Sequence, residues 1–208
     1  MKINPIYIQL IGDAAIPLAG FFWWEWSLYF ILLFYIMDLL VAEGVTHLKS
    51  KKVVEFRGEA PKQWMLSGAI SFLLLVIVVS TVHGAAFFIH PGIDFQKELW
   101  SFWTYEELGV QQGYVLLPLL LFAGYQQYKL FFLAPRRHEQ MRVKTVWSRQ
   151  FFTYIVLIGA CGLALSVAII FKLQEEIVYV LAVVAGSTAF KWFYMERLPA
   201  RSSNPRRK

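Results

Sequence analysis

Long apolar segments alternate with short polar ones along most of the chain. The segment 64–89 contains no Asp, Glu, Lys or Arg, and several other segments are nearly as apolar. A transmembrane helix needs about 20 apolar residues. The pattern therefore predicts an all-α membrane protein with six transmembrane helices, or five if the first, which is short and carries two prolines, is re-entrant. The expected spans are about 5–22, 26–48, 64–89, 109–133, 150–171 and 177–195.

Two further segments have a different character. Residues 92–107 are polar and acidic, yet Phe95, Leu99 and Phe102 recur at helical spacing. An apolar stripe of this kind is typical of a short helix that lies in the membrane interface, and we expect it on the outer side. Residues 197–208 are basic and contain two prolines, which predicts a disordered cytoplasmic tail. We expect residues 1–196 to form a single transmembrane domain.

The basic residues predict an orientation. Fifteen of the 20 Lys and Arg residues fall at 49–63, 135–149 and 195–208, between or after the apolar segments. Lys and Arg are retained on the cytoplasmic side during insertion. The distribution therefore predicts cytoplasmic N- and C-termini in a bacterial inner membrane.

Composition narrows the classes of protein and of partner. With 58% hydrophobic and 16% charged residues, the chain lacks the polar surface of a soluble domain. The net charge of +6 lies where a cytoplasmic face is expected, so anionic lipid headgroups are a simpler partner than nucleic acid. Binding of a cytoplasmic partner and a plain role as topology determinants are the alternatives for these basic loops. The residues that we expect to contact anionic lipid are Lys49, Lys51, Lys52, Arg136 and Arg137.

Two acidic residues lie near the middle of predicted spans. Counting ~1.5 Å per residue from the aromatic turn at 23–26 places Asp13 about 14 Å deep and Asp38 about 18 Å deep. A charge at that depth costs about 2.5–3.5 kcal/mol, which makes each residue a candidate site. We expect the two carboxyl groups to be protonated, to share a proton, to face water, or to bind a cation or the basic group of a partner. A structural hydrogen bond to a neighbouring helix is the alternative.

Other titratable groups extend this series along the depth of the membrane. Glu43 and His47 are four residues apart and share one helix face near the cytoplasmic end, while His83 lies towards the outer end of its span. Such a series is compatible with a proton or cation path. Against a single file, Asp38 and His47 lie about 180° apart around their helix. Polar groups that only hold helices together, or that lie in the wet interface, are the competing interpretation.

Catalytic and cofactor signals are weak. Ser187 with His83 lacks any residue to orient the histidine, so it does not form a recognisable serine hydrolase motif. The single cysteine, Cys161, lies inside an apolar segment and supplies neither a disulfide nor a thiolate metal site. We therefore expect no metal and no cofactor. The sequence favours a non-enzymatic role, with an intramembrane enzyme as an alternative.

A stretch near the N-terminus carries a family resemblance. Trp26-Ser27-Leu28, the Leu-rich run after it, Tyr35 and then Asp38 three residues on form the pattern. It resembles the second-helix pattern of an uncharacterised family of bacterial multi-pass membrane proteins, and the similarity covers about the first fifty residues. Asp38 stands where that pattern has glutamate. The resemblance implies a membrane location and draws attention to Asp38, but it implies no activity.

Three functional hypotheses follow from these features. The first is a non-enzymatic membrane subunit or accessory protein with a membrane protein partner, because the chain has no soluble domain and no catalytic constellation. The second is a small proton- or cation-coupled transporter or channel that uses Asp13 and Asp38. The third is an intramembrane enzyme that acts on lipid or peptide, which would need a water-filled cavity around Ser187 and His83 or around Glu43 and His47.

Overall fold

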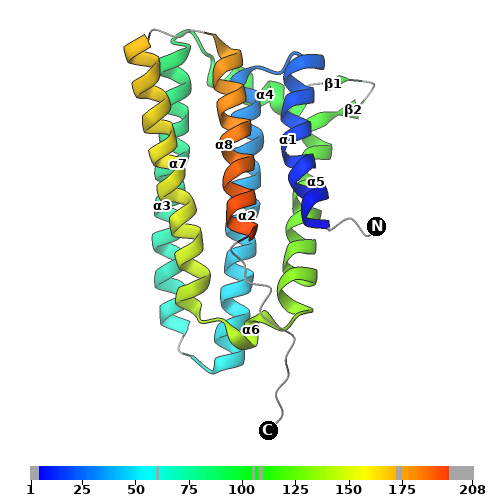
Figure 1. The fold of residues 1–208 in the computed structure, drawn as a ribbon, viewed down its shortest axis with the longest axis vertical. Coiled ribbons are helices and arrows are strands. Elements are labelled where there is room, and N and C mark those ends of the chain that lie inside the picture. Colours follow the sequence, from blue (N-terminus) through cyan, green and yellow to red (C-terminus); the bar gives the residue numbers. More distant parts are fainter. Residues whose placement is uncertain (1–4, 60, 105, 108–109, 172–174, 197–208) are drawn as a thin grey trace. The chain divides into compact units, whose positions relative to one another are not determined.

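The part of the chain described by the computed structural model, residues 5–59, 61–104, 106–107, 110–171 and 175–196, is almost entirely helical (Figure 1). This confirms the expected all-α fold, to which the described residues add one small β-hairpin. The elements are α1 Pro5–Trp23, α2 Leu28–Arg57, α3 Pro61–Ile89, α4 Phe95–Thr104, β1 Glu106–Glu107, β2 Val110–Gln111, α5 Gln112–Tyr128, the π-helical turn η1 Lys129–Leu133, α6 Arg137–Gln140, α7 Val143–Phe171 and α8 Glu176–Glu196.

The chain divides into two units, which are described separately. The terminal unit comprises residues 1–28 and 175–208, and the central unit comprises residues 29–174. The predicted tail, 197–208, lies outside the described residues.

In the terminal unit, α1 and α8 pack against each other (Figure 1). The aromatic turn after α1 folds back on that helix, because the backbone N–H of Trp26 donates to the carbonyl of Gly20 over 3.0 Å. The indole of Trp26 then occupies the space that a Cβ at Gly20 would need, so a side chain there would clash. At the other end of the turn, the N–H of Leu28 donates to Glu176 at the start of α8 over 3.3 Å.

In the central unit, α2 continues well past the expected end at residue 48 and stops at Arg57. Gly58 adopts φ +62°, and the N–H of Glu59 donates to the carbonyl of Val54 over 3.2 Å. This bond and the left-handed glycine form a Schellman C-cap. No proline interrupts the basic segment before Gly58, and Lys and Arg favour the C-terminal end of a helix dipole. The helix therefore ends where its backbone stop signal lies and not where its apolar stretch ends.

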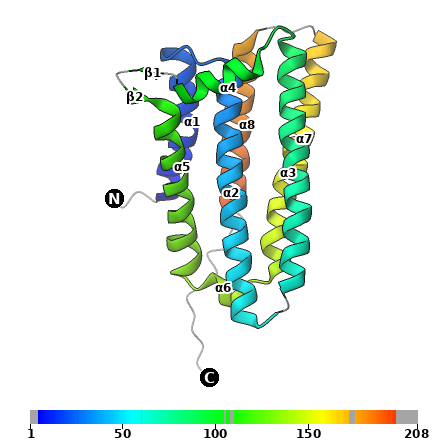
Figure 2. The ribbon, with the colours of Figure 1, turned by 180° about the vertical axis from the view of Figure 1, so that it is seen from behind.

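Helix α7 also extends beyond its apolar stretch, beginning at Val143 and not near 150, and it packs along α3 (Figures 1 and 2). The first turns of α7 bury their apolar side against α2 and η1. These apolar residues belong to a core cluster at one end of the central unit. We call this end the basic end, because the basic segments 49–63 and 135–149 lie there. The cluster consists of Val53, Val54, Phe132, Val143, Val146 and Trp147.

At the opposite end, α4 is the short helix expected within 92–107. The Asp94 carboxylate caps it by accepting hydrogen bonds from the N–H groups of Gln96 and Lys97, both over 3.1 Å. Phe102, 1% exposed, lies on its buried side, whereas Trp100 is 69% exposed. The helix is thus amphipathic as expected. Strands β1 and β2 form a hairpin in which Glu106 pairs with Gln111. Strand β2 lies at the start of the expected span 109–133, so α5 begins only at Gln112.

Four helical segments are long and apolar enough to cross a membrane: Leu28–Arg57, Pro61–Ile89, Gly113–Leu133 and Val143–Phe171. Two shorter apolar helices, Ala14–Trp23 and Glu176–Phe190, fall below that length among the described residues. Six spans therefore remain a prediction. Large apolar side chains such as Phe72, Phe122 and Ile170 are more than half exposed on the long helices, which suits a lipid environment.

Candidate functional site

A buried carboxyl group joins three helices of the central unit. Glu43 lies on α2 and is 6% exposed. Its Oε2 accepts a hydrogen bond from the hydroxyl of Ser71 on α3 over 2.8 Å and one from the hydroxyl of Tyr154 on α7 over 2.6 Å. Ser71 and Tyr154 are both fully buried. A single oxygen atom therefore holds α3 and α7 to α2.

Two further polar side chains extend this contact between α2 and α7. The amide nitrogen of Gln150 donates to the Tyr154 hydroxyl over 2.9 Å. The Thr46 hydroxyl, which donates over 2.8 Å to the carbonyl of Ala42, also lies 3.3 Å from the Gln150 carbonyl oxygen. Gln150 precedes Tyr154 by one helical turn, and Thr46 lies one turn after Glu43, so helical spacing aligns both pairs. We call Glu43, Thr46, Ser71, Gln150 and Tyr154 the Glu43 network.

His47 connects this network to the surface. Its Nε2 lies 3.2 Å from Glu43 Oε1, and its side chain is 37% exposed whereas that of Glu43 is 7% exposed. Glu43 Oε1 is buried and accepts no hydrogen bond with good geometry from the described residues, so this contact is electrostatic and depends on the charge of the imidazole. A carboxyl group that is otherwise shielded thus has one titratable neighbour with access to solvent.

The position of the His47 ring is fixed by its neighbours. The ring packs edge-on against Trp147 at 4.8 Å between centroids, and Trp64 lies at 6.3 Å. A Cβ at position 68 would lie 2.5 Å from His47 Cε1, so the glycine on α3 leaves room for the imidazole. Trp147 is itself held by its indole N–H, which donates to the buried hydroxyl of Ser50 over 2.7 Å.

His83 is not part of this network. It lies on α3, as Ser71 does, but near the opposite end of the central unit. Its Nε2 is 2.7 Å from the Tyr29 hydroxyl, and its Nδ1 is 2.8 Å from the carbonyl of Val79. If Nδ1 carries the hydrogen and donates to Val79, Nε2 accepts from Tyr29, and both nitrogens of a neutral ring are satisfied. Phe95 of α4 covers the pair, 5.4 Å from the His83 ring.

The structure places the two predicted intramembrane acids differently. Asp38 is partly buried on α2, about 140° around the helix from Glu43; it is not a member of the Glu43 network. Asp13 lies on α1 in the terminal unit, but its side chain lies outside the described residues. A direct relation between Asp13 and Asp38 therefore stays a prediction.

The residues expected to contact anionic lipid differ in their surroundings. Lys52 pairs with Glu55 over 3.3 Å and Arg136 with Glu139 over 3.5 Å. Lys49 donates to Gln127 over 3.3 Å. Lys51 is exposed and Arg137 is partly buried.

Sequence reasoning missed four members of the network: Thr46, Ser71, Gln150 and Tyr154. Ser71 and Tyr154 can be recognised in the sequence as polar residues inside apolar helices. An uncharged polar residue is a weaker indication of a site in a membrane helix than Asp or Glu, because it costs less to bury. Gln150 was visible only as the start of a span. Among the residues that the structure describes, no group of three His, Cys, Asp or Glu side chains can hold a metal ion.

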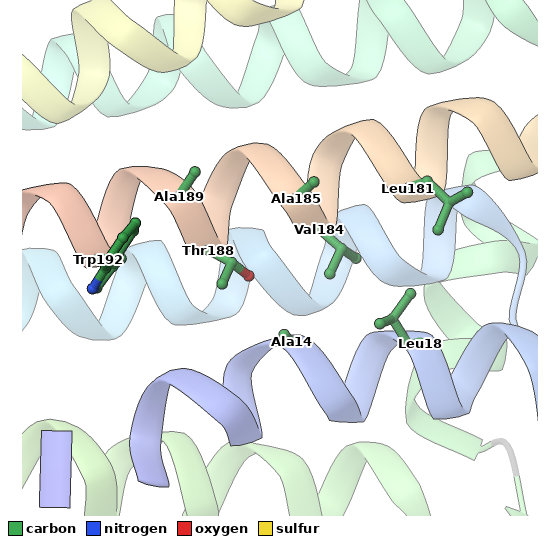
Figure 3. A pocket seen from close by; sticks show the side chains of 8 residues that line it. All are labelled: Ala14, Leu18, Leu181, Val184, Ala185, Thr188, Ala189 and Trp192. Atoms are coloured by element: carbon green, nitrogen blue, oxygen red, sulfur yellow. The ribbon is translucent and has the colours of Figure 1, made fainter. Parts of the chain in front are cut away.

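An apolar groove in the terminal unit is a second feature (Figure 3). It has a volume of about 480 Å³, and Ala14 and Leu18 of α1 face Val184, Thr188 and Trp192 of α8 across it. The hydroxyl of Thr188 is buried and makes no hydrogen bond to any described residue. The groove has room for an apolar group, but its lining residues include no charged side chain.

Comparison with known proteins adds no relative: no family model, curated protein or solved structure matches the chain. The resemblance of the segment 26–38 to a family of multi-pass membrane proteins therefore stays an expectation from the sequence.

Proposed function

We propose that the chain is a multi-pass membrane protein that acts as a non-enzymatic subunit or accessory protein, and that the Glu43 network is the polar tie that fixes α2, α3 and α7. The observation that carries this proposal is the double hydrogen bond to Glu43 Oε2 from Ser71 and Tyr154. Hydrogen bonds between buried polar groups hold helices together, and groups that are bonded in this way are not open to a substrate.

The same proposal includes an orientation. The basic end carries two of the three basic clusters, and we place it on the cytoplasmic side of a bacterial inner membrane. Six spans require α1 and α8 to cross as well. Reporter fusions after positions 56 and 142 test this orientation, and an external location of either reporter argues against it.

Partner binding tests the accessory role. The full chain carries an affinity tag and is purified from its native membrane in mild detergent, with the partner identified by mass spectrometry. We expect a second membrane protein in a fixed ratio. A monodisperse chain without a partner, which also catalyses pH-dependent ion flux in proteoliposomes, would refute the accessory role.

One observation favours a second candidate, a proton- or cation-coupled carrier. His47 is partly exposed and touches the buried Glu43, so the pair links the surface to a shielded carboxyl group, and Asp38 lies further along the same helix. Flux of a pH-sensitive dye in proteoliposomes tests this function. It requires flux in the wild type that Glu43→Gln or Asp38→Asn abolishes, with Lys51→Gln as a control that leaves flux unchanged.

A further inference from the structure

The two oxygens of the Glu43 carboxyl group have different surroundings. Oε2 accepts hydrogen bonds from the hydroxyl groups of Ser71 and Tyr154 over 2.8 and 2.6 Å. The Tyr154 hydroxyl also accepts a hydrogen bond from the amide of Gln150 over 2.9 Å, so its own hydrogen is directed at Glu43. A carboxyl oxygen has two lone pairs, and both of those on Oε2 are used. A proton on this carboxyl group therefore belongs on Oε1.

Oε1 of Glu43 faces the imidazole of His47. This oxygen is buried and accepts no hydrogen bond with good geometry from the described residues, and His47 Nε2 lies 3.2 Å away from it. A buried carboxylate that has no positive neighbour is costly in free energy. One proton makes the pair neutral overall, whether the proton lies on Oε1 or on the imidazole. The two residues therefore bind that proton as one unit.

The two helices packed against His47 present uncharged groups to its ring. On α3 these are Trp64, at 6.3 Å between ring centroids, and Gly68, where a Cβ would lie 2.5 Å from His47 Cε1. On α7 it is Trp147, at 4.8 Å between ring centroids. The charged residues nearest to these contacts along the three helices have exposed side chains: Lys51 on α2, Lys62 on α3 and Lys144 on α7. Glu43 is thus the acidic partner of the imidazole, and the 37% exposure of the His47 side chain gives protons access from solvent.

We propose that Glu43 and His47 form a proton-binding site that regulates the polar tie among α2, α3 and α7; this inference rests on the tie proposed above. The positive charge of a protonated imidazole attracts the buried carboxylate, and the attraction disappears when the pair loses its proton. An imidazole changes its charge between about pH 5 and about pH 8. The tie is therefore stronger on the acidic side of this range and weaker on the alkaline side.

The position of the site determines the compartment whose pH it follows. His47 packs against Trp147, a member of the core cluster at the basic end, and we place that end on the cytoplasmic side. The hydrogen bonds from Ser71 and Tyr154 go to the other oxygen of Glu43. The proton therefore changes the strength of the tie and leaves the pairing of the helices as it is. The packing of three helices thus responds to cytoplasmic pH.

A double-mutant cycle measured at two pH values tests the site. The variants of the full chain are His47→Gln, Glu43→Gln and the two together. Equilibrium unfolding in mixed micelles at about pH 6 and about pH 8 gives the unfolding equilibrium constant of each variant. We expect the coupling between positions 43 and 47 to be about fivefold in that constant at the lower pH and less than about twofold at the higher pH.

Two controls separate the proton from other effects. Lys51→Gln removes an exposed charge one turn from His47 and should leave the coupling within about twofold of its wild-type value at each pH. The cycle of Tyr154→Phe with Glu43→Gln should give the same coupling at both pH values, because no imidazole takes part in that contact. If Glu43→Gln does not fold, His47→Gln alone carries the test. It should destabilise the protein more at the lower pH than at the higher, whereas Lys51→Gln should show no such difference.

Two results would overturn the proposal. A coupling between positions 43 and 47 that is equal at both pH values means that the contact does not depend on a proton. A coupling that is larger at the higher pH means that the neutral imidazole is the stronger partner. In either case, an intact coupling between positions 43 and 154 leaves the polar tie standing, whereas loss of that coupling refutes the tie itself. Neither result bears on partner binding, so failure of the proton site remains distinct from failure of the accessory role.

Discussion

Replacing Tyr154 by phenylalanine removes one hydroxyl group from the centre of the Glu43 network and leaves the ring in place. The hydroxyl donates to Glu43 Oε2 over 2.6 Å and accepts from Gln150 over 2.9 Å. Both contacts are lost in Tyr154→Phe, and because Tyr154 is fully buried, water has little access to replace them. Among the described residues, Ser71 is then the one hydrogen-bond donor left to Glu43.

The expected cost follows from these two contacts. Hydrogen bonds between membrane helices contribute about 0.6 kcal/mol on average and up to about 1.7 kcal/mol. The bond to a carboxyl group lies at the upper end of that range, and the Gln150 amide is left without its partner. We therefore expect Tyr154→Phe to lower the free energy of unfolding by about 2 kcal/mol.

Equilibrium unfolding of the purified full chain in mixed micelles measures this change. Tyr128→Phe is the matched control, because Tyr128 stacks on Phe132 and is not a member of the Glu43 network as the described residues form it. It should change stability by less than about 0.5 kcal/mol. A double-mutant cycle with Glu43→Gln should give a coupling energy of about 1 kcal/mol or more. Equal stability of the Tyr154 and Tyr128 variants would refute the structural role of the network.

Three glycine and capping substitutions test the local geometry. Gly68→Ala pushes against His47 and should lower the unfolding free energy by about 1–3 kcal/mol, whereas Gly84→Ala, with no atom within 4 Å, should not; equal effects would contradict the packing. Gly58→Ala places a side chain at φ +62° and should cost about 1–2 kcal/mol; an unchanged melting temperature would count against the Schellman cap. Asp94→Ala should cost about 1 kcal/mol by removing the cap of α4, seen as lower helicity in circular dichroism; unaltered helicity would show that the cap is dispensable.

The sequence predicted the long helices but not their exact ends, the small hairpin or the contacts between helices. Apolar length alone identified each long helix, because burying a backbone in lipid requires helical hydrogen bonds. The spacing of Glu43 and His47 placed them on one face, and the structure has them 3.2 Å apart. The ends of α2 and α7 were misplaced because their positions depend on Gly58 and on the buried face around Trp147, and not on where the apolar stretch ends.

The partners of Glu43 were beyond sequence reasoning for a physical reason. A helix that is apolar all round carries no stripe to show which face meets a neighbour. Ser71 and Tyr154 could therefore be seen as polar residues in α3 and α7, but nothing in their spacing pointed to α2. The long-range pairing emerges only when three helices pack.

The arrangement of polar groups along α2 also bears on the choice between a structural tie and a proton path. Tyr29 forms a hydrogen bond with His83 near one end of the helix. Glu43 accepts hydrogen bonds from Ser71 and Tyr154 nearer the other end. The distance from position 29 to position 43 is about 21 Å at ~1.5 Å per residue. Ile31 and Phe34, which lie between them, are buried and apolar. A continuous path would need water or Asp38 to bridge that interval, whereas two polar ties at opposite ends of one helix need nothing between them. The spacing therefore favours α2 as a helix anchored at both ends.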